Sequence, residues 1–281
     1  MTKRIFTLIA LCLVCAMPAL AGIHYKSRTH QEGKGASKQM DMTVEGWVDG
    51  DNAKIVFTES RNDLMGKGSY LLTTDGGKVL YLVDPKEKTY TEWDLNAMMN
   101  MAGAAMDSMG GMFQMEFSDP EVEKLLEESG GTILGLPTTH YRYRTAYTMD
   151  MKIMGMKRSQ AVETVQDIWS TEELADPALG VWLKREPPTM GNTGLEKVIE
   201  AEMSKMKGFP LKTIDESIST GQKGKQQVTK TTTEVFELEQ TSISGDIFEI
   251  PADYERREMD LGNLEGGEDA NPFKQKKKSK G

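Results

Sequence analysis

Residues 79–90 read Val79-Leu80-Tyr81-Leu82-Val83-Asp84-Pro85-Lys86-Glu87-Lys88-Thr89-Tyr90. A short apolar run is followed by a tight polar turn and a second short run, which is typical of two neighbouring strands. Turn residues of the same kind occur at Asp49-Gly50 and at Asp75-Gly76, each between apolar runs. Because parallel strands need long crossover connections, this pattern predicts an antiparallel meander over residues 24–93.

The rest of the chain predicts a second set of strands and two longer helices. The strands are expected over residues 140–156, 160–169, 211–220 and 226–240. Ser118 as an N-cap and Pro120 near the first turn predict a helix that ends at Gly130. Its apolar stripe would be Val122, Leu125 and Leu126. A second helix is expected over residues 193–207, so the sequence indicates an α+β fold.

The first 21 residues have the pattern of a secretory signal peptide. Lys3 and Arg4 precede an apolar run over residues 5–17, and Ala19 and Ala21 place small residues at a cleavage site. The run is too short for a membrane span. We expect a cut after Ala21 and export, which leads to the periplasm in a bacterium with two membranes.

Export would leave a chain without cysteines, because Cys12 and Cys15 both lie in this leader. The formal net charge would move from −9 to −11, since the leader carries two cations and no acids. We expect residues 22–258 to form the folded domain. Residues 259–281 are rich in Gly, Glu, Asp, Asn and Lys, a composition that predicts a disordered charged tail.

Charge and motifs argue against several functional classes. The acidic balance disfavours nucleic acid as a partner. The sequence has no Gly-x-Ser-x-Gly, no phosphate-binding Gly-x-x-x-x-Gly-Lys and no His-Glu-x-x-His. The three imidazoles, His24, His30 and His140, lack the spacing of a metal or catalytic site. We therefore expect a protein that is not an enzyme and that carries no cofactor.

Methionine is unusually frequent, with twenty residues in the chain. Those that recur at a step of three are Met98, Met101, Met106, Met109, Met112 and Met115. One hypothesis is a loosely helical flap whose flexible thioethers line an adaptable apolar pocket. A second hypothesis makes the thioethers ligands for Cu(I), with Met98, Met101, Met106 and Met109 as the candidate set. In a third, they fill gaps in the core.

One short pattern occurs twice. Residues 24–29 read His-Tyr-Lys-Ser-Arg-Thr, residues 140–145 read His-Tyr-Arg-Tyr-Arg-Thr, and each copy is followed by Met-Asp-Met. One interpretation is a pair of related half-sheets that flank a common cavity. The other is the general similarity of strands in which basic and apolar residues alternate.

Four sequence segments resemble those of a known family. They are residues 82–90, Ile133-Leu134-Gly135-Leu136-Pro137-Thr138-Thr139-His140-Tyr141, Asp167-Ile168-Trp169-Ser170-Thr171-Glu172-Glu173-Leu174 and Phe248-Glu249-Ile250-Pro251-Ala252-Asp253-Tyr254. Together they resemble an exported bacterial family known as a domain of unknown function, which is similar to the lipoprotein-localisation (LolA/LolB-like) superfamily. The resemblance covers residues 22–258. It implies a strongly curved antiparallel sheet, an unclosed β-barrel, with helices over its concave face.

In that superfamily the space between sheet and helices accepts acyl chains or other apolar molecules. The resemblance implies a cavity lined by Ile55, Phe57, Leu80, Leu82 and Trp169. It also implies a cover formed by residues 98–115 and by the helix after Thr193. We expect an exported carrier of an apolar ligand such as a lipid or acyl chain, with an envelope protein as a further candidate partner. The alternatives are a periplasmic Cu(I)-binding protein and a structural envelope protein whose cavity is plugged.

Overall fold

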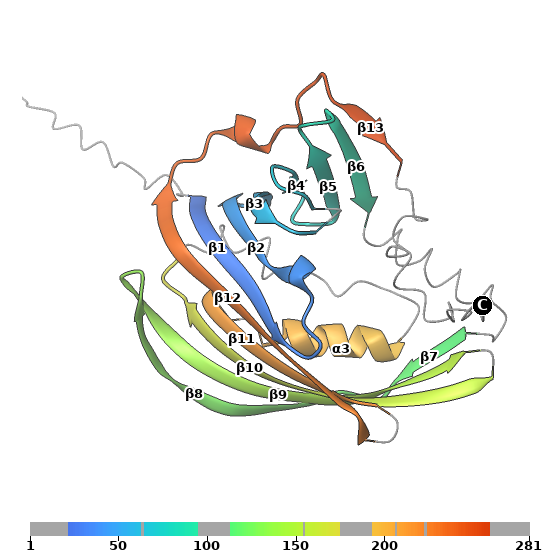
Figure 1. Ribbon diagram of the computed structural model, residues 1–281. Helices are drawn as coiled ribbons and strands as arrows, with labels where there is room; N and C mark the ends of the chain where they lie inside the picture. Colours follow the sequence, from blue (N-terminus) through green and yellow to red (C-terminus); the bar gives the residue numbers. More distant parts are fainter. Residues whose placement is uncertain are drawn as a thin grey trace, which may run out of the picture.

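The computed structural model describes residues 22–62, 65–94, 113–153, 155–174, 193–205, 207–221 and 224–258. These residues form one large, curved, unclosed sheet of 13 strands (Figure 1). Strand order along the sheet is β13-β6-β5-β4-β3-β2-β1-β12-β11-β10-β9-β7, and β8 also pairs with β9. All pairings are antiparallel except the short one between β13 and β6.

Strands lie close to the ranges predicted over residues 24–93, 140–156, 160–169, 211–220 and 226–240, whereas residues 113–117 and 121–133 form strands that were not predicted. Those of the first set are β1 Gly22–Gly33, β2 Met42–Asp49, β3 Asn52–Ser60, β4 Tyr70–Thr73, β5 Val79–Asp84 and β6 Thr89–Asp94. Those of the second set are β7 Phe113–Phe117, β8 Glu121–Ile133, β9 Leu136–Ile153, β10 Met156–Thr171, β11 Phe209–Thr220, β12 Gln226–Thr241 and β13 Glu255–Arg257. The other elements described are the α-helix α3 Thr193–Met203 and the short 3-10 helices η1 Lys38–Met40 and η3 Gly245–Phe248.

The first strand lies in the middle of the sheet. On one side β1 pairs with β2, and on the other it pairs with β12 along its whole length, from Gly22 opposite Thr241 to Gly33 opposite Thr229. Since β12 continues to β11, β10 and β9, this single pairing joins the first set of strands to the second.

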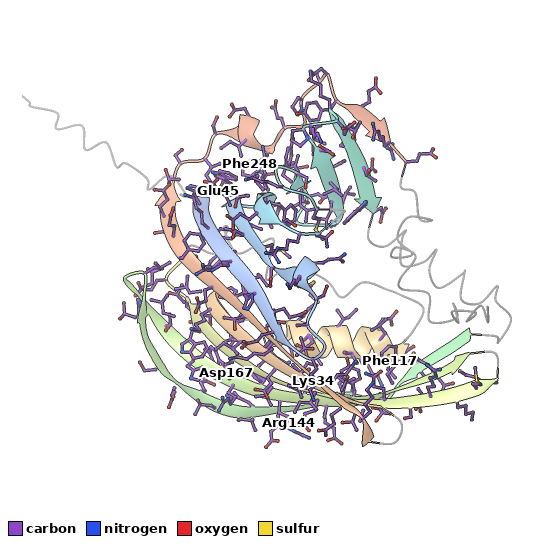
Figure 2. The ribbon with its side chains drawn as sticks, viewed as in Figure 1. Lys34, Glu45, Phe117, Arg144, Asp167 and Phe248 are labelled. Carbon is purple, nitrogen blue, oxygen red and sulfur yellow. The ribbon has the colours of Figure 1, made fainter. Side chains whose placement is uncertain are left out.

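Each face of the sheet carries a core. On the inner side of the bend, which we call the concave face, one buried cluster joins both sets of strands; its members are Ile23, Tyr25, Val48, Ala53, Leu174, Phe209, Leu211 and Val235. On the outer, convex face, a second cluster of Tyr70, Leu72, Val83 and Phe248 is covered by the segment that includes Ile243, Ile247, Ile250 and Tyr254. Figure 2 shows Phe248 between η3 and the first set of strands.

The Tyr25 ring occupies the concave face directly over Gly46, its partner on β2. A Cβ atom at position 46 would lie 2.4 Å from a ring carbon of Tyr25, which no side chain tolerates. The ring also meets Phe209 edge-on, with centroids 5.6 Å apart. Glycine at position 46 therefore makes room for the aromatic contact between the two sets of strands.

The helix expected from Ser118 to Gly130 is wrong, because residues 121–133 form strand β8. The residues Leu134 and Gly135 connect β8 to β9 with positive φ values of 52° and 82°. Two consecutive residues with positive φ form the turn that matches the twist of a β-hairpin. This turn and the pairing with β9 override the helical preference of the glutamate, lysine and leucine residues in β8.

The helix predicted over residues 193–207 is present as α3, which Figure 1 shows within the bend of the sheet, beside β7. The leader and the charged tail, residues 1–21 and 259–281, lie outside the described residues, and so does most of the methionine-rich segment. No helix in the described part of the chain is both long and apolar enough to cross a membrane.

Candidate functional site

A row of apolar side chains crosses the concave face of the first strand set. Ile55 on β3 pairs with Leu71 on β4, and Leu71 pairs with Leu82 on β5. Leu80, two residues before Leu82, pairs with Trp93 on β6. Because partners in an antiparallel pair and residues two apart on a strand share a face, all five lie on the same side of the sheet. We call Ile55, Leu71, Leu80, Leu82 and Trp93 the apolar row.

The apolar row lies on the concave side, since Ile55 follows Ala53 of the concave cluster by two residues. All five side chains are only half-buried, and none belongs to a core cluster of the described residues. By contrast Tyr70, Leu72 and Val83, which alternate with them, are at most 6% exposed on the convex face. The short strands β4 and β5 thus bury one face and leave apolar surface on the other.

The structure brings together four of the five lining residues expected from the sequence. Ile55, Leu80 and Leu82 are members of the apolar row, and Phe57 lies on the same face but is 3% exposed. Sequence reasoning missed Leu71 and Trp93. The apolar run around Leu71 does predict a strand. Because such a strand has apolar residues on both faces, the sequence does not show which face is covered.

Trp169 lies on the convex face, opposite to the apolar row. Its neighbour Ile168 is 1% exposed and packs with Tyr141 and Tyr143 on the concave side, so the next residue points the other way. There the Trp169 ring stacks on His140 with centroids 4.1 Å apart and planes inclined by 4°. Because the convex and concave faces are separated by the sheet, Trp169 has no contact with the space beside Ile55.

Beside its buried apolar and aromatic residues, the concave face of β1 and of the second strand set also carries polar side chains. Hydrogen-bonded side chains on this part of the face include the pairs Thr29–Thr233, Gln31–Thr231, Thr164–Ser217 and Gln166–Asp215. Burial raises the pKa of Asp215, and the hydrogen bond from Gln166 only partly opposes this. The Thr145 hydroxyl is fully buried and has no hydrogen-bond partner in the described part of the chain. We call this region the polar wall.

The helix α3 and the residues that follow it lie over the polar wall. Lys205 is 1% exposed, and its ammonium group is 2.7 Å from a carboxylate oxygen of Glu202. Both residues interact electrostatically with Asp215 of β11. Val198 is the buried residue of α3. Charged groups and the apolar contact of Val198 both contribute to the place of the helix.

Charged side chains on the convex face pair with one another in the described part of the chain. His24 lies 2.8 Å from carboxylate oxygens of both Glu45 and Glu239. Burial alone would lower the pKa of His24, but these two hydrogen bonds outweigh it and the pKa is raised. His140 is 2.7 Å from Asp167, which also binds Arg142. Within the described residues, no group of three or more His, Cys, Asp or Glu side chains could hold a metal ion.

Two open hollows on the sheet are lined by charged side chains. One, of about 810 Å³, lies at the far ends of β1–β3 and includes Arg28, Arg61, Asp41 and Glu59. The other, of about 450 Å³, includes Arg144 and Glu163, which pair at 2.6 Å. Their linings mix both charges, so neither offers the apolar surface that the apolar row provides.

The methionine hypotheses fall largely outside the described residues. Met98, Met101, Met106, Met109 and Met112 are not described. Met115 lies in β7, where its backbone pairs with that of Met151 on β9. The last member of the methionine series is thus part of the sheet.

Comparisons with known proteins identify a family for this chain. The family model described as "Domain of unknown function (DUF4412)" matches residues 36–254. No curated protein matches the chain. Among solved structures, the one titled "Structure of PNGF-II in P21 space group" is similar with a TM-score of 0.35 and 11% identity. The match covers 85% of this chain and 32% of that one, so the chain spans about a third of its length.

Proposed function

The chain belongs to the DUF4412 family, a domain of unknown function, and on that premise we propose a function from the geometry of the sheet. We propose that it is an exported, non-enzymatic protein that binds or carries an apolar ligand, such as a lipid or an acyl chain, on the concave face. The observation that carries the proposal is the half-buried apolar row of β3–β6.

An acyl chain gains enough free energy from such a surface to bind without catalysis. Each methylene group transferred from water to an apolar environment contributes about 0.8 kcal/mol. A chain of about 14 carbons therefore offers on the order of 10 kcal/mol before the costs of ordering and association are subtracted. This gain is non-directional, which suits a surface made largely of leucine, isoleucine and tryptophan side chains.

The polar wall and α3 support a ligand that has one polar end. Lipids and fatty acids carry a head group that must keep its hydrogen bonds when it leaves water. The hydroxyl of Thr145 and the side chains of Gln166 and Asp215 lie on the same face as the apolar row. Since Val198 is the only buried residue of α3, the helix can serve as a cover that opens at modest cost. This arrangement also agrees with the LolA/LolB-like resemblance.

Export is part of the proposal. The signal-peptide pattern ends at Ala21, and β1 begins at Gly22 in the centre of the sheet. Cleavage after Ala21 would therefore leave every described strand intact. A Cβ at position 22 would lie 2.7 Å from the Val48 carbonyl oxygen, so the small residue that follows the cut is also needed by the fold. N-terminal sequencing of protein from the envelope fraction is expected to begin at Gly22.

Quenching of tryptophan fluorescence by nitroxide-labelled stearic acid tests the site. A nitroxide bound on the concave face would quench Trp93, which is in the apolar row, and would leave Trp169 on the other face unaffected. We expect the quenched fraction of the emission to fall sharply in Trp93→Phe and to stay at or above the wild-type fraction in Trp169→Phe. The two variants make the same chemical change on opposite faces of the sheet.

A second pair of variants tests affinity. Leu82→Gln places a polar group in the apolar row and should weaken binding of the probe roughly tenfold, because about 1–2 kcal/mol of apolar contact is lost. Val228→Gln makes a similar change at a residue on β12 that is 37% exposed and should leave binding unchanged. Absence of binding by the wild-type chain would instead favour the plugged structural protein. Native mass spectrometry that finds bound Cu(I) and no lipid would favour the copper hypothesis.

A further inference from the structure

Strand β8 forms a long free edge of the sheet. It pairs with β9 along residues 121–133, and no other strand in the described ranges pairs with its second edge. Figure 1 shows β8 as the outermost strand at the bottom of the bend. Its side chains are exposed at almost every position, including Val122 at 41% and Leu125 at 44%. Alternate residues of such a strand turn their N–H and C=O groups away from the sheet, where another strand can bind them.

The two faces of β8 differ in charge. On the convex face lie Glu123, opposite Arg144, and Glu128, opposite His140, with Glu121 two residues before Glu123. On the concave face lie Val122 and the ion pair of Lys124 with Glu127. A strand added at the free edge would therefore meet a row of carboxylates on one face and, on the other, Val122 and an ion pair with no net charge.

Strand β9, which pairs with β8, shows which kind of sequence fits beside β8. In β9, the basic residues His140, Arg142 and Arg144 alternate with Tyr141 and Tyr143, so that all the cations share the convex face. Opposite charges in directly paired cross-strand positions stabilise a sheet, and like charges destabilise it. The carboxylates of β8 lie between β9 and the free edge, so the same pattern fits on both sides of them.

The charge of β8 argues against a second copy of the same strand. β8 contains four glutamates and one lysine. An antiparallel pair of two β8 strands would bring acidic residues opposite one another on the convex face, which is a known way for edge strands to avoid self-association. A basic partner avoids this repulsion.

We propose that the free edge of β8 binds an extended segment of another protein in which basic residues alternate with aromatic or aliphatic residues. The backbone of the segment continues the ladder, and its cations pair with Glu121, Glu123 and Glu128. Since the residues of β8 favour a helix when taken alone, the strand depends on its neighbours. A second neighbour would hold β8 from both sides.

A synthetic peptide with the sequence of residues 139–147 provides the probe, because it carries the β9 pattern. The control is an isomer of the same composition with its basic residues placed consecutively, which puts them on both faces of a strand. We expect fluorescence anisotropy at moderate salt to show at least tenfold tighter binding of the alternating peptide to the full-length protein. We also expect backbone amides of β8 to become protected from hydrogen exchange when it binds.

Variants locate the binding surface. Glu121→Gln/Glu123→Gln/Glu128→Gln should weaken binding of the alternating peptide about tenfold or more, because three opposite-charge pairs are lost. Glu87→Gln/Glu249→Gln removes two charges at exposed positions far from β8 and should leave binding unchanged. Circular dichroism confirms that each variant keeps its sheet.

Three outcomes would overturn the proposal. Equal binding of the two peptides would show that only net charge matters. Equal loss in the two sets of variants would place the contact elsewhere. A wild-type protein that dimerises, and whose dimer is broken by Leu125→Lys, would show that the edge is occupied by a second copy.

Discussion

Each of the two sets of strands contains a histidine stacked on a tryptophan, but different residues surround the two stacks. In the first set, His24 of β1 stacks on Trp47 of β2 with centroids 5.0 Å apart, and in the second, His140 of β9 stacks on Trp169 of β10 at 4.1 Å. Both histidines belong to the sequence pattern that occurs twice in the chain. Trp47 packs against the convex cluster around Phe248, whereas Trp169 lies beside the ammonium group of Lys212, 5.7 Å from its ring.

The difference comes from the segment that follows β12. Residues 243–254 return over the convex face of β3–β6 and supply Phe248 to the cluster. No described segment returns over the convex face of β9 and β10, where ion pairs such as Arg144–Glu163 face solvent. Residues 243–254 therefore exclude water from the convex face of the first set. They do not cover its concave face, where the apolar row lies. The following predictions test this comparison, from the largest expected effect to the smallest.

Removal of the Phe248 side chain, which residues 243–254 contribute to the convex cluster, should have the largest effect on stability. Phe248 is 6% exposed, and Phe248→Ala should lower the free energy of unfolding by about 3–5 kcal/mol because it opens a cavity in the convex cluster. Phe236, on β12, is 41% exposed, so Phe236→Ala should cost less than about 1 kcal/mol. Urea denaturation measures both. Equal losses would mean that residues 243–254 do not act as a cover.

The carboxylates that bind the two histidines should also contribute unequally to stability, and here the larger contribution is expected in the second set. Asp167 is 7% exposed and binds both His140 and Arg142, so Asp167→Asn should cost about 2 kcal/mol. Glu45 is more exposed, and Glu239 remains to bind His24 if Glu45 is changed. Glu45→Gln should therefore cost below about 1 kcal/mol. A larger loss in Glu45→Gln than in Asp167→Asn would reverse this ranking.

The smallest effect concerns pH. Because hydrogen bonds to Glu239 and Glu45 raise the pKa of His24 above its ordinary value of 6.5, its protonated form stabilises the fold. This contribution is fully present below about pH 6.5 and is lost as the pH rises through the folded-state pKa. NMR titration of the His24 ring should give a midpoint above 6.5, and Glu239→Gln should lower it. A midpoint below 6.5 in the wild-type protein would contradict the prediction.

Much of the sheet was predictable because short apolar runs are separated by turn residues such as Asp49-Gly50 and Asp75-Gly76. Ile55, Leu80 and Leu82 were expected together only from the family resemblance, and the register of the strands places them on one face. Trp169 could not be placed, because Ile168 beside it is equally apolar. Only the three-dimensional register decides which of two adjacent apolar residues faces inward.

Strand β8 was missed for a related reason. Its residues combine a good helix cap with leucines at helical spacing, so local preference and final structure disagree. The deciding information lay outside the segment, in the turn at Leu134-Gly135 and in the cations of β9. The residues that make β8 a strand therefore lie in the next segment of the chain and not in residues 121–133 themselves.

The central place of β1 has a consequence for how the chain acquires its structure. Its partner β12 is about two hundred positions further on, at Thr229–Thr241, so the sheet cannot be assembled before nearly the whole polypeptide has been synthesised. Pairings at such long sequence separation form slowly. The sheet of a nascent chain would thus remain incomplete for most of its synthesis. If the chain is exported as proposed, that delay would keep it unfolded while it passes through a translocation channel.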